Sequence, residues 1–217
     1  MKTLTAEALY SQLGLNDSPL IVDVRSAAEL DRAPHMIPSA LWLNGKDVEQ
    51  WSRRLPPRRA IAVYCADGEM SADIAVRMSA RGMPAAVMAG GLTDWIERKF
   101  PTIKARREYG VPGGSRWVTR ERPKIDRLAC PWLVRRFIDP HAAFFYVPAQ
   151  QVRSEGSALG AEPYDIAVVT FSHRGPYCSF DAFLDEYSQH DPILDGHAEI
   201  VRAADTGVLA QSREAPG

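Results

Sequence analysis

The stretch AVYCADGEMSADIAVRMSARG, residues 62–82, passes from an apolar segment through a single cysteine into a helical pattern. The apolar residues 62–64 predict the end of a buried strand, and residues 71–81 predict a helix that ends at Gly82. A chain that turns from a strand into a helix leaves unpaired backbone N–H groups in the turn, and these groups favour an anion together with the helix dipole. Because a thiol ionises more readily in such a turn, Cys65 is either a reactive thiolate or, like many free cysteines, a buried packing residue.

The size and composition of the chain are those of a globular protein. Its 217 residues are enough for one large domain or two domains of about 100 residues each. Hydrophobic residues make up 46% and charged residues 24%, and the net charge of −1 gives the whole molecule no electrostatic signature. No apolar run is long enough to cross a bilayer, and the acid-containing N-terminus does not resemble a signal peptide, so we expect no membrane partner.

The cysteines bear on the compartment and on metal binding. Three cysteines far apart in the sequence argue against a disulfide framework and predict a cytoplasmic protein. The sequence has no CxxC pair and no HExxH motif. It therefore predicts no cofactor, and it leaves any metal unknown.

Strand and helix signals alternate through the first hundred residues. Short apolar runs predict buried parallel strands at residues 19–24, 60–64 and 85–88. Helical patterns lie between and after them, at residues 27–30, 45–54, 71–81 and 92–99. This alternation predicts an α/β fold in which helices flank a mainly parallel sheet.

Composition divides the chain into two halves. The segment KARREYGVPGGS combines charge, proline and glycine as linkers do, so we expect a first domain at residues 1–103, a linker at 104–115 and a second domain at 116–217. Residues 98–136 hold twelve Lys or Arg and three acids, whereas residues 181–205 hold seven acids and one base. These runs are either solvated faces or, for the basic run, a surface for an oxyanion or a phosphate backbone.

Four motifs of the first half resemble those of the single-domain rhodaneses. IVDVR at residues 21–25 and HMIPSA at 35–40 resemble the family's DVR and GHIPGA signatures, and AGGLTDW at 89–95 resembles its closing GGxxxW. The loop that begins at Cys65 lies where the family has its CxxGxRS active-site loop. The resemblance covers roughly residues 5–103 and implies the rhodanese fold.

The resemblance also implies a chemistry. In rhodaneses the loop cysteine takes sulfane sulfur from a donor, becomes a persulfide and passes the sulfur to a thiol acceptor. Cys65 would be the catalytic nucleophile, its thiolate stabilised by backbone N–H groups of the loop, while Asp23 and Arg25 would brace the structure. We expect Gly68 to let the loop bend and Ser71 to cap the following helix. The active-site loop comprises Ala66, Asp67, Gly68, Glu69, Met70 and Ser71.

The loop departs from the family pattern in its charge. Met70 stands where rhodaneses usually have arginine, and the loop adds the carboxylates of Asp67 and Glu69. Thiosulfate is a dianion that would meet two carboxylates and no guanidinium, and this repulsion grows in a partly dry pocket. We therefore expect a sulfurtransferase with weak thiosulfate activity and a small-thiol or protein donor.

Three blocks of the second half resemble the chromate-resistance protein B family. They are RWVTRERPKIDRLACPWLVRRFIDPHAAFFYVP at residues 116–148, FSHRGPYCSFDAF at 171–183 and IVRAADT at 200–206. Members of this family are associated with bacterial chromate-resistance operons as regulators or accessory proteins. The family normally continues with further helices, so the end at QSREAPG predicts a shortened domain.

The second half also carries candidate site residues of its own. Pro131 suits the first turn of a helix and so predicts Cys130 at its N-cap, and Ser179 is expected to cap a helix over residues 180–188 just after Cys178. All three cysteines would then precede helix starts, where thiolates are favoured. Chromate is an oxidising tetrahedral dianion, so binding it needs arginine donors, and trapping it needs thiols. The candidate oxyanion and thiol site comprises Asp126, Arg127, Cys130, Arg135, His173, Cys178, Asp181 and Asp205.

Other interpretations of these residues stay open. The two cysteines also fit buried packing, and His173 and Asp205 fit a satisfied polar network better than a metal site. Trp117, Trp132 and the aromatic run from residue 144 fit a core better than a stacking platform. We expect further strands at residues 144–147 and 166–171, and a helix-rich α+β domain overall.

Two functions follow. The first is a cytoplasmic bacterial sulfurtransferase, with a persulfide on Cys65, joined to a chromate-resistance domain in thiol-dependent handling of chromate. Its partners would be a sulfane-sulfur donor, a thiol acceptor and chromate. The alternative is a non-catalytic chromate-binding sensor or regulator of a chromate-resistance operon whose basic run binds nucleic acid. Nucleic acid is not favoured, because the sequence has no helix-turn-helix pattern and the basic run is partly linker. The sequence does not give the oligomeric state.

Overall fold

A computed structural model of the chain describes residues 2–15, 17–105, 114–189 and 191–207. It divides into two compact units, Met1–Val111 and Pro112–Gly217, and each is described by itself. Most of the linker predicted at residues 104–115 lies outside the described residues, as does the predicted shortened end from residue 208.

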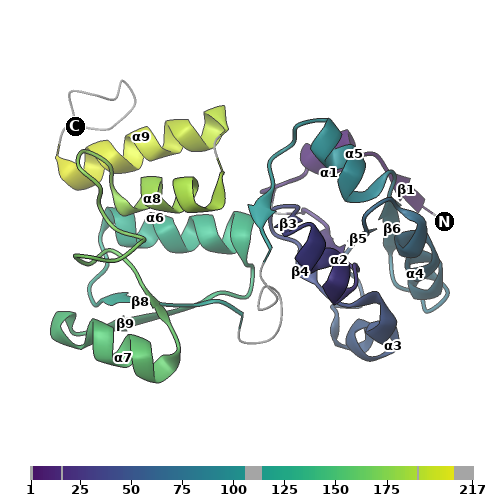
Figure 1. Cartoon of the computed structure of the whole chain (residues 1–217), viewed down its shortest axis with the longest axis horizontal. Coiled ribbons are helices and arrows are strands. Elements are labelled where there is room, and N and C mark those ends of the chain that lie inside the picture. The colour runs from purple at the N-terminus through teal and green to yellow at the C-terminus, as the bar shows by residue number, and fades with distance from the viewer. Residues whose placement is uncertain (1, 16, 106–113, 190, 208–217) are drawn as a thin grey trace. The chain divides into compact units, whose positions relative to one another are not determined.

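The first unit is built on a five-stranded sheet in the order β1-β6-β5-β2-β4, with parallel pairing throughout (Figure 1). Its strands are Lys2–Leu4 (β1), Leu20–Asp23 (β2), Leu41–Trp42 (β4), Ile61–Tyr64 (β5) and Ala85–Met88 (β6). The residues of β2, β5 and β6 are all buried, because helices cover both faces of the sheet. A short antiparallel pair joins β3 (His35–Met36) to β7 (Ile103–Lys104). The predicted α/β fold is confirmed.

Helices of the first unit connect these strands. They are Ala6–Tyr10 (α1), Ala27–Arg32 (α2), Val48–Trp51 (α3), Glu69–Ser79 (α4) and Gly91–Glu97 (α5). Figure 1 shows α1 and α5 together on one side of the sheet, while apolar residues of α3 and α4 pack on the other face. The helix predicted at residues 45–54 is instead a short α3 between two 3₁₀ turns, Gly45–Asp47 (η1) and Ser52–Arg54 (η2).

A buried ion pair braces the first unit just before the cysteine loop. Arg25 donates to both carboxylate oxygens of Asp23, at 2.6 Å for its Nη2, and these residues are 1% and 0% exposed. The guanidinium also donates to the carbonyls of Ala33 and His35, and the Tyr64 hydroxyl donates to Asp23 at 2.9 Å. A buried pair is tolerated only when its remaining donors and acceptors are satisfied in this way. The predicted bracing role is confirmed.

The second unit has a three-stranded parallel sheet in the order β10-β8-β9. The strands are Arg116–Arg120 (β8), Ala143–Val147 (β9) and Glu162–Pro163 (β10). The helices are Ile125–Leu133 (α6), which continues into a π-helical turn Val134–Ile138 (η3), then Ala149–Gln151 (η4, a 3₁₀ turn), Val152–Leu159 (α7), Ser179–Tyr187 (α8) and Pro192–Thr206 (α9). Figure 1 shows α6, α8 and α9 stacked on one side of this sheet and α7 on the other. This unit is helix-rich, as predicted.

Two predictions for the second unit are wrong. Residues 166–171 do not form a strand, because Asp165 and Val168 have left-handed backbones with φ of +53° and +60°, and an extended strand cannot pass through such residues. Trp132 is not in the core but 43% exposed, with its ring stacked on His197. Trp117, by contrast, is 1% exposed at the centre of an aromatic core, as expected.

Among the residues that the structure describes, no helix combines the length and the apolar character that crossing a membrane requires.

Candidate functional site

The first candidate site is the turn between β5 and α4. Cys65 follows the last residue of β5, and α4 begins at Glu69, so the helix starts two residues earlier than the sequence pattern predicts. Gly68 is the N-cap residue and has a φ of +101°, a conformation that side chains with a Cβ rarely adopt. The glycine therefore allows the chain to pass from strand to helix within this short loop.

The Cys65 sulfur is held by groups of its own loop. The Gly68 N–H donates to Sγ at 3.2 Å, and the Ser71 hydroxyl lies 3.5 Å from Sγ while donating to the Gly68 carbonyl at 3.0 Å. Ser71 thus lies in the first turn of α4 with its hydroxyl directed inward, and the prediction that it caps the helix is wrong. Asp67 accepts from the Glu69 N–H, which lowers the pKa of its carboxyl, and its Oδ1 lies 3.5 Å from Sγ.

Residues at the start of α5 donate hydrogen bonds to the backbone carbonyls of this loop. The Cys65 carbonyl accepts from the Leu92 N–H at 2.8 Å, and the Ala66 carbonyl accepts from both the N–H and the hydroxyl of Thr93. A Cβ added at Gly91, where φ is +59°, would lie 2.6 Å from both carbonyl oxygens. Only glycine fits there, which gives the AGGLTDW motif a physical role in positioning the cysteine.

The rim of the loop carries Met70 and Glu69. Met70 is 37% exposed, and its sulfur lies beside Gly45, where a Cβ would come within 3.0 Å of it. Cys65 itself is only 1% exposed. The loop therefore covers the sulfur, and its charged groups nearest the sulfur are carboxylates.

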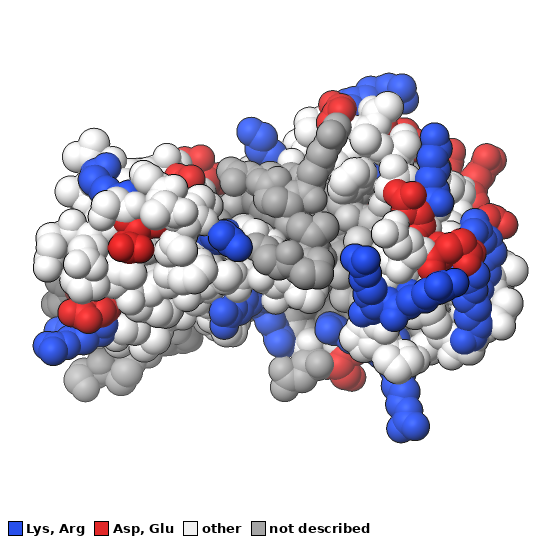
Figure 2. Space-filling model, turned by 90° about the horizontal axis from the view of Figure 1, so that it is seen from below, with Lys and Arg blue, Asp and Glu red and all other residues white. Residues whose placement is uncertain are grey.

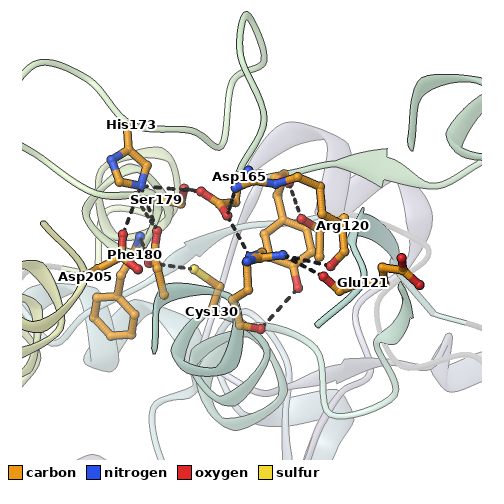
Figure 3. Close-up of polar contacts among 12 residues, drawn as sticks. Arg120, Glu121, Cys130, Asp165, His173, Ser179, Phe180 and Asp205 are labelled. Atoms are coloured by element: carbon orange, nitrogen blue, oxygen red, sulfur yellow. Dashed lines mark hydrogen bonds and ion pairs between the residues drawn. The ribbon is translucent and has the colours of Figure 1, made fainter. Parts of the chain in front are cut away.

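The second candidate site is a polar cluster in the second unit (Figure 3). Asp126, in the first turn of α6, accepts from the backbone N–H groups of Ser179 and Phe180 at 2.7 and 2.9 Å. These are the first two residues of α8, so Asp126 supplies the anion that the N-terminus of α8 favours. The carboxylate is 1% exposed, and this burial raises its pKa.

Asp165 and Arg120 belong to the cluster, although the sequence analysis selected neither. The Asp165 Oδ2 atom lies 2.8 Å from Nη2 of Arg120 and 3.0 Å from Nε of Arg127, and Oδ1 accepts from the Ser179 hydroxyl. Arg120 ends β8, and Asp165 follows shortly after β10. Because the carboxyl ends of neighbouring parallel strands meet at one edge, the polar residues at these two strand ends were a signal that could have found the pair.

His173 lies at the centre of the carboxylates. Its Nε2 atom is 3.4 Å from Asp126, 3.4 Å from Asp165 and 3.3 Å from Asp205. Figure 3 shows this edge of the imidazole turned toward the carboxylates. The structure thus brings together Asp126, Arg127, His173 and Asp205 from the predicted set.

The two cysteines of this unit differ from the prediction. Cys130 lies inside α6 and not at its start, although its Sγ is 3.4 Å from Asp126. Cys178 is the N-cap residue of α8, so this helix begins one residue earlier than predicted, and the prediction that Ser179 caps it is wrong. Burial raises the pKa of both thiols, and the nearby carboxylate of Asp126 raises them further. The expectation that these helix positions favour thiolates is therefore wrong.

Two other predicted site residues bond elsewhere. Arg135 donates to the Ala142 carbonyl at 3.1 Å, and its guanidinium lies over the Phe144 ring. Asp181 accepts from the Cys178 N–H and pairs with Arg202 at 2.7 Å. The proposed convergence of two arginines and two thiols on one oxyanion thus has little support in the geometry.

Arginines of the basic run at residues 98–136 also bond within their own units. Arg98 pairs with Asp94 at 2.8 Å, and Arg116 donates to the Leu159 carbonyl at 2.9 Å. On the face drawn in Figure 2, the Lys and Arg side chains of the second unit stand apart among uncharged residues, with acids between them. These features favour a solvated face, and nucleic-acid binding stays an alternative.

The parallel sheet and the cysteine loop give the first unit the architecture of a rhodanese-like domain, and comparison with known families agrees. Residues 5–98 match the rhodanese-like domain, and residues 117–217 match the family described as ChrB, C-terminal domain. The chain therefore joins a rhodanese-like domain to a ChrB C-terminal domain.

Individual relatives match one half or the other. Protein ChrB of Cupriavidus metallidurans is 38% identical over 119 residues, which cover 54% of this chain and 33% of ChrB, so the chain spans about a third of that relative. A sulfurtransferase of Allochromatium vinosum is 27% identical over 101 residues, 46% of this chain and 92% of that protein. A crystal structure of a rhodanese-like domain protein from Staphylococcus aureus is 27% identical and covers 44% of this chain and 91% of that chain, with a TM-score of 0.41.

Proposed function

We propose that the first unit is a sulfurtransferase in which Cys65 forms a persulfide. The observation that carries the proposal is the position of the Cys65 sulfur, which accepts the Gly68 N–H at the start of α4. An amide at a helix N-terminus stabilises both a thiolate and the anionic sulfur that it receives. The similarity to the Allochromatium vinosum sulfurtransferase over residues of this half supports the same chemistry.

The reaction has two displacement steps. The Cys65 thiolate attacks the outer sulfur of a donor persulfide, R–S–SH, the bond between the donor's two sulfurs breaks, and R–S⁻ leaves. An acceptor thiolate, R′–S⁻, then attacks the terminal sulfur of Cys65–S–SH and leaves as R′–S–SH, which regenerates the Cys65 thiolate. Each step exchanges one S–S bond for another, so the cycle needs no external oxidant or reductant.

The loop selects among donors by access and charge. Because Cys65 is 1% exposed, a donor reaches the sulfur only when the covering loop residues shift outward. Asp67 lies 3.5 Å from the sulfur as a carboxylate, and it repels the dianion thiosulfate more than it repels a persulfide of lower charge. The preferred donor is therefore a small-thiol or protein persulfide.

Trapping of the persulfide tests the assignment. Full-length protein is incubated with a low-molecular-weight persulfide and analysed by peptide mass spectrometry for one added sulfur atom. Wild-type chain should carry it on Cys65, Cys65→Ser should carry none, and Cys178→Ser should behave as wild type because serine is a good N-cap residue. Sulfur found on another cysteine of wild-type chain, or retained in Cys65→Ser, would remove Cys65 from the reaction.

The wider role is thiol-dependent handling of chromate in a reducing cytoplasm. It rests on the resemblance of the second half to the chromate-resistance family and on the free state of all three cysteines. If the sulfur chemistry serves this role, chromate tolerance conferred by the chain should be lost in Cys65→Ser and kept in Cys178→Ser. Equal tolerance in the two variants would separate the persulfide from chromate and favour a non-catalytic sensor.

A further inference from the structure

The cluster around His173 collects metal-ligating atoms from three separate parts of the second unit. Asp126 belongs to α6, His173 precedes α8, and Asp205 lies in the last turn of α9. One ligating atom from each of the three lies within 4.8 Å of the others. Figure 3 shows the Asp205 carboxylate facing the imidazole edge of His173.

Hydrogen bonding does not account for this spacing. The Nε2 atom of an imidazole carries at most one proton, so it makes one good hydrogen bond, yet three carboxylates surround it. Each contact measures 3.3 to 3.4 Å, whereas a charge-assisted hydrogen bond measures about 2.7–2.9 Å. Ligand atoms bonded at about 2.1 Å to one tetrahedral metal ion lie about 3.4 Å apart. The distances from Nε2 to Asp126 and Asp205 thus match two edges of such a coordination shell.

The charges of the cluster also leave room for a cation. Arg120 and Arg127 both pair with Asp165, so that carboxylate is already compensated. Asp126 and Asp205 face a single imidazole, and Asp126 is buried where an uncompensated carboxylate is costly. With a neutral imidazole, one dication balances these two carboxylates, while a chromate dianion would be repelled by them.

The surroundings of Asp126 are those of a fixed ligand. Two backbone N–H groups of α8 orient its carboxylate, and the Asp165 carboxylate lies 3.4 Å from the same Nε2 atom of His173. Such partners commonly hold metal ligands in position. The outer side is open, since the side chains of His173 and Asp205 are 39% and 21% exposed. A bound ion could therefore also hold water or a small ligand.

We propose that Asp126, His173 and Asp205 bind one divalent transition-metal ion, beside the Asp165 carboxylate that two arginines already compensate. One nitrogen and two carboxylate ligands suit Mn²⁺, Fe²⁺ or Zn²⁺ better than a soft, thiolate-seeking metal. The site is independent of the sulfur transfer proposed for the first unit.

Titration of the full-length chain with Mn²⁺ alone tests the site, with free Mn²⁺ followed by its electron paramagnetic resonance signal. Mn²⁺ avoids competition from the thiols because it prefers oxygen and nitrogen ligands. Wild-type chain should bind one ion saturably. Asp205→Asn and His173→Gln, both at partly exposed positions that should fold, should each weaken binding by at least about tenfold.

Each variant has a matched control on α9: a second carboxylate for Asp205→Asn and a second histidine for His173→Gln. Glu199→Gln removes another α9 carboxylate, and His197→Gln removes a histidine of α9 whose ring stacks on Trp132. Both should bind Mn²⁺ as wild type does, and so should Cys65→Ser. Absence of saturable binding, equal affinity in Asp205→Asn and His173→Gln, or equal loss in the two controls would overturn the site.

Discussion

Cys65 and Cys178 both stand at the start of a helix, yet their surroundings are opposite. At α4 the Gly68 amide points at the cysteine sulfur at 3.2 Å. At α8 the first two amides of the helix bond instead to the carboxylate of Asp126, which arrives from α6. The same local feature therefore gives a thiol with an anion-stabilising donor in one unit and a thiol beside a resident anion in the other.

This difference shows that a helix N-terminus favours an anion without choosing which anion. At α8 the Asp126 carboxylate already accepts the first two N–H groups of the helix. Burial and the charge of this carboxylate both raise the pKa of Cys178. The N-terminus of α8 thus binds the structural carboxylate of Asp126, whereas the N-terminus of α4 faces the candidate nucleophile Cys65.

The largest expected effect is on thiol reactivity. In native chain, Cys65 should be alkylated by iodoacetamide at least about a hundredfold faster than Cys130 and Cys178. All three sulfurs are buried, but the Gly68 N–H stabilises a thiolate at Cys65, whereas burial and the Asp126 carboxylate raise the pKa of the other two thiols. Time-resolved peptide mass spectrometry gives the three rates, and unfolded chain in denaturant provides the intrinsic rates. Similar native rates at Cys65 and Cys178 would erase the distinction between the two helix starts.

The next effect is on stability. Asp126→Ala leaves two buried amides of α8 without their acceptor and should lower the free energy of unfolding by about 2–3 kcal/mol, measured by urea denaturation. Asp126→Asn, which keeps one acceptor oxygen, should lose less. Asp67→Ala is the matched control at α4, where the carboxylate bonds an exposed amide, and its loss should be smaller still. Equal losses for the two alanine variants would show that the burial of Asp126 adds nothing.

The smallest effect is on donor choice. Met70→Arg should raise thiosulfate turnover by about tenfold, if the guanidinium stabilises the transition state by ~1.4 kcal/mol. Steady-state assays with thiosulfate measure the change. Val76→Arg adds the same charge further along α4, at a side chain that is 49% exposed, and should leave the rate unchanged. A rate for Met70→Arg no higher than that control would show that the missing cation does not limit thiosulfate use.

Most of the first unit was predictable from sequence, and the reasons for the errors elsewhere are specific. Short apolar runs separated by helical patterns gave β2, β5 and β6, since strands buried on both faces are apolar throughout. Pro131 misled because a proline usually begins a helix, whereas here it lies inside α6. Pro131 has no N–H to donate to the Arg127 carbonyl four residues earlier. The Tyr164 hydroxyl lies 3.5 Å from that carbonyl and can donate to it instead. Only the folded chain supplies that partner.

The sequence by itself identified the cysteine loop, because the contacts of the Cys65 sulfur lie between Cys65 and Ser71, where local backbone geometry fixes them. The support that the loop carbonyls receive from α5 came only with the tertiary structure. The sequence also named Asp126, His173 and Asp205 as candidates. Only the tertiary structure decided that these three meet, since α6, the loop before α8, and α9 reach one point through helix packing. Helix packing depends on how the side chains of two whole helix faces fit together, and residue spacing along the chain does not indicate which helix faces will be in contact.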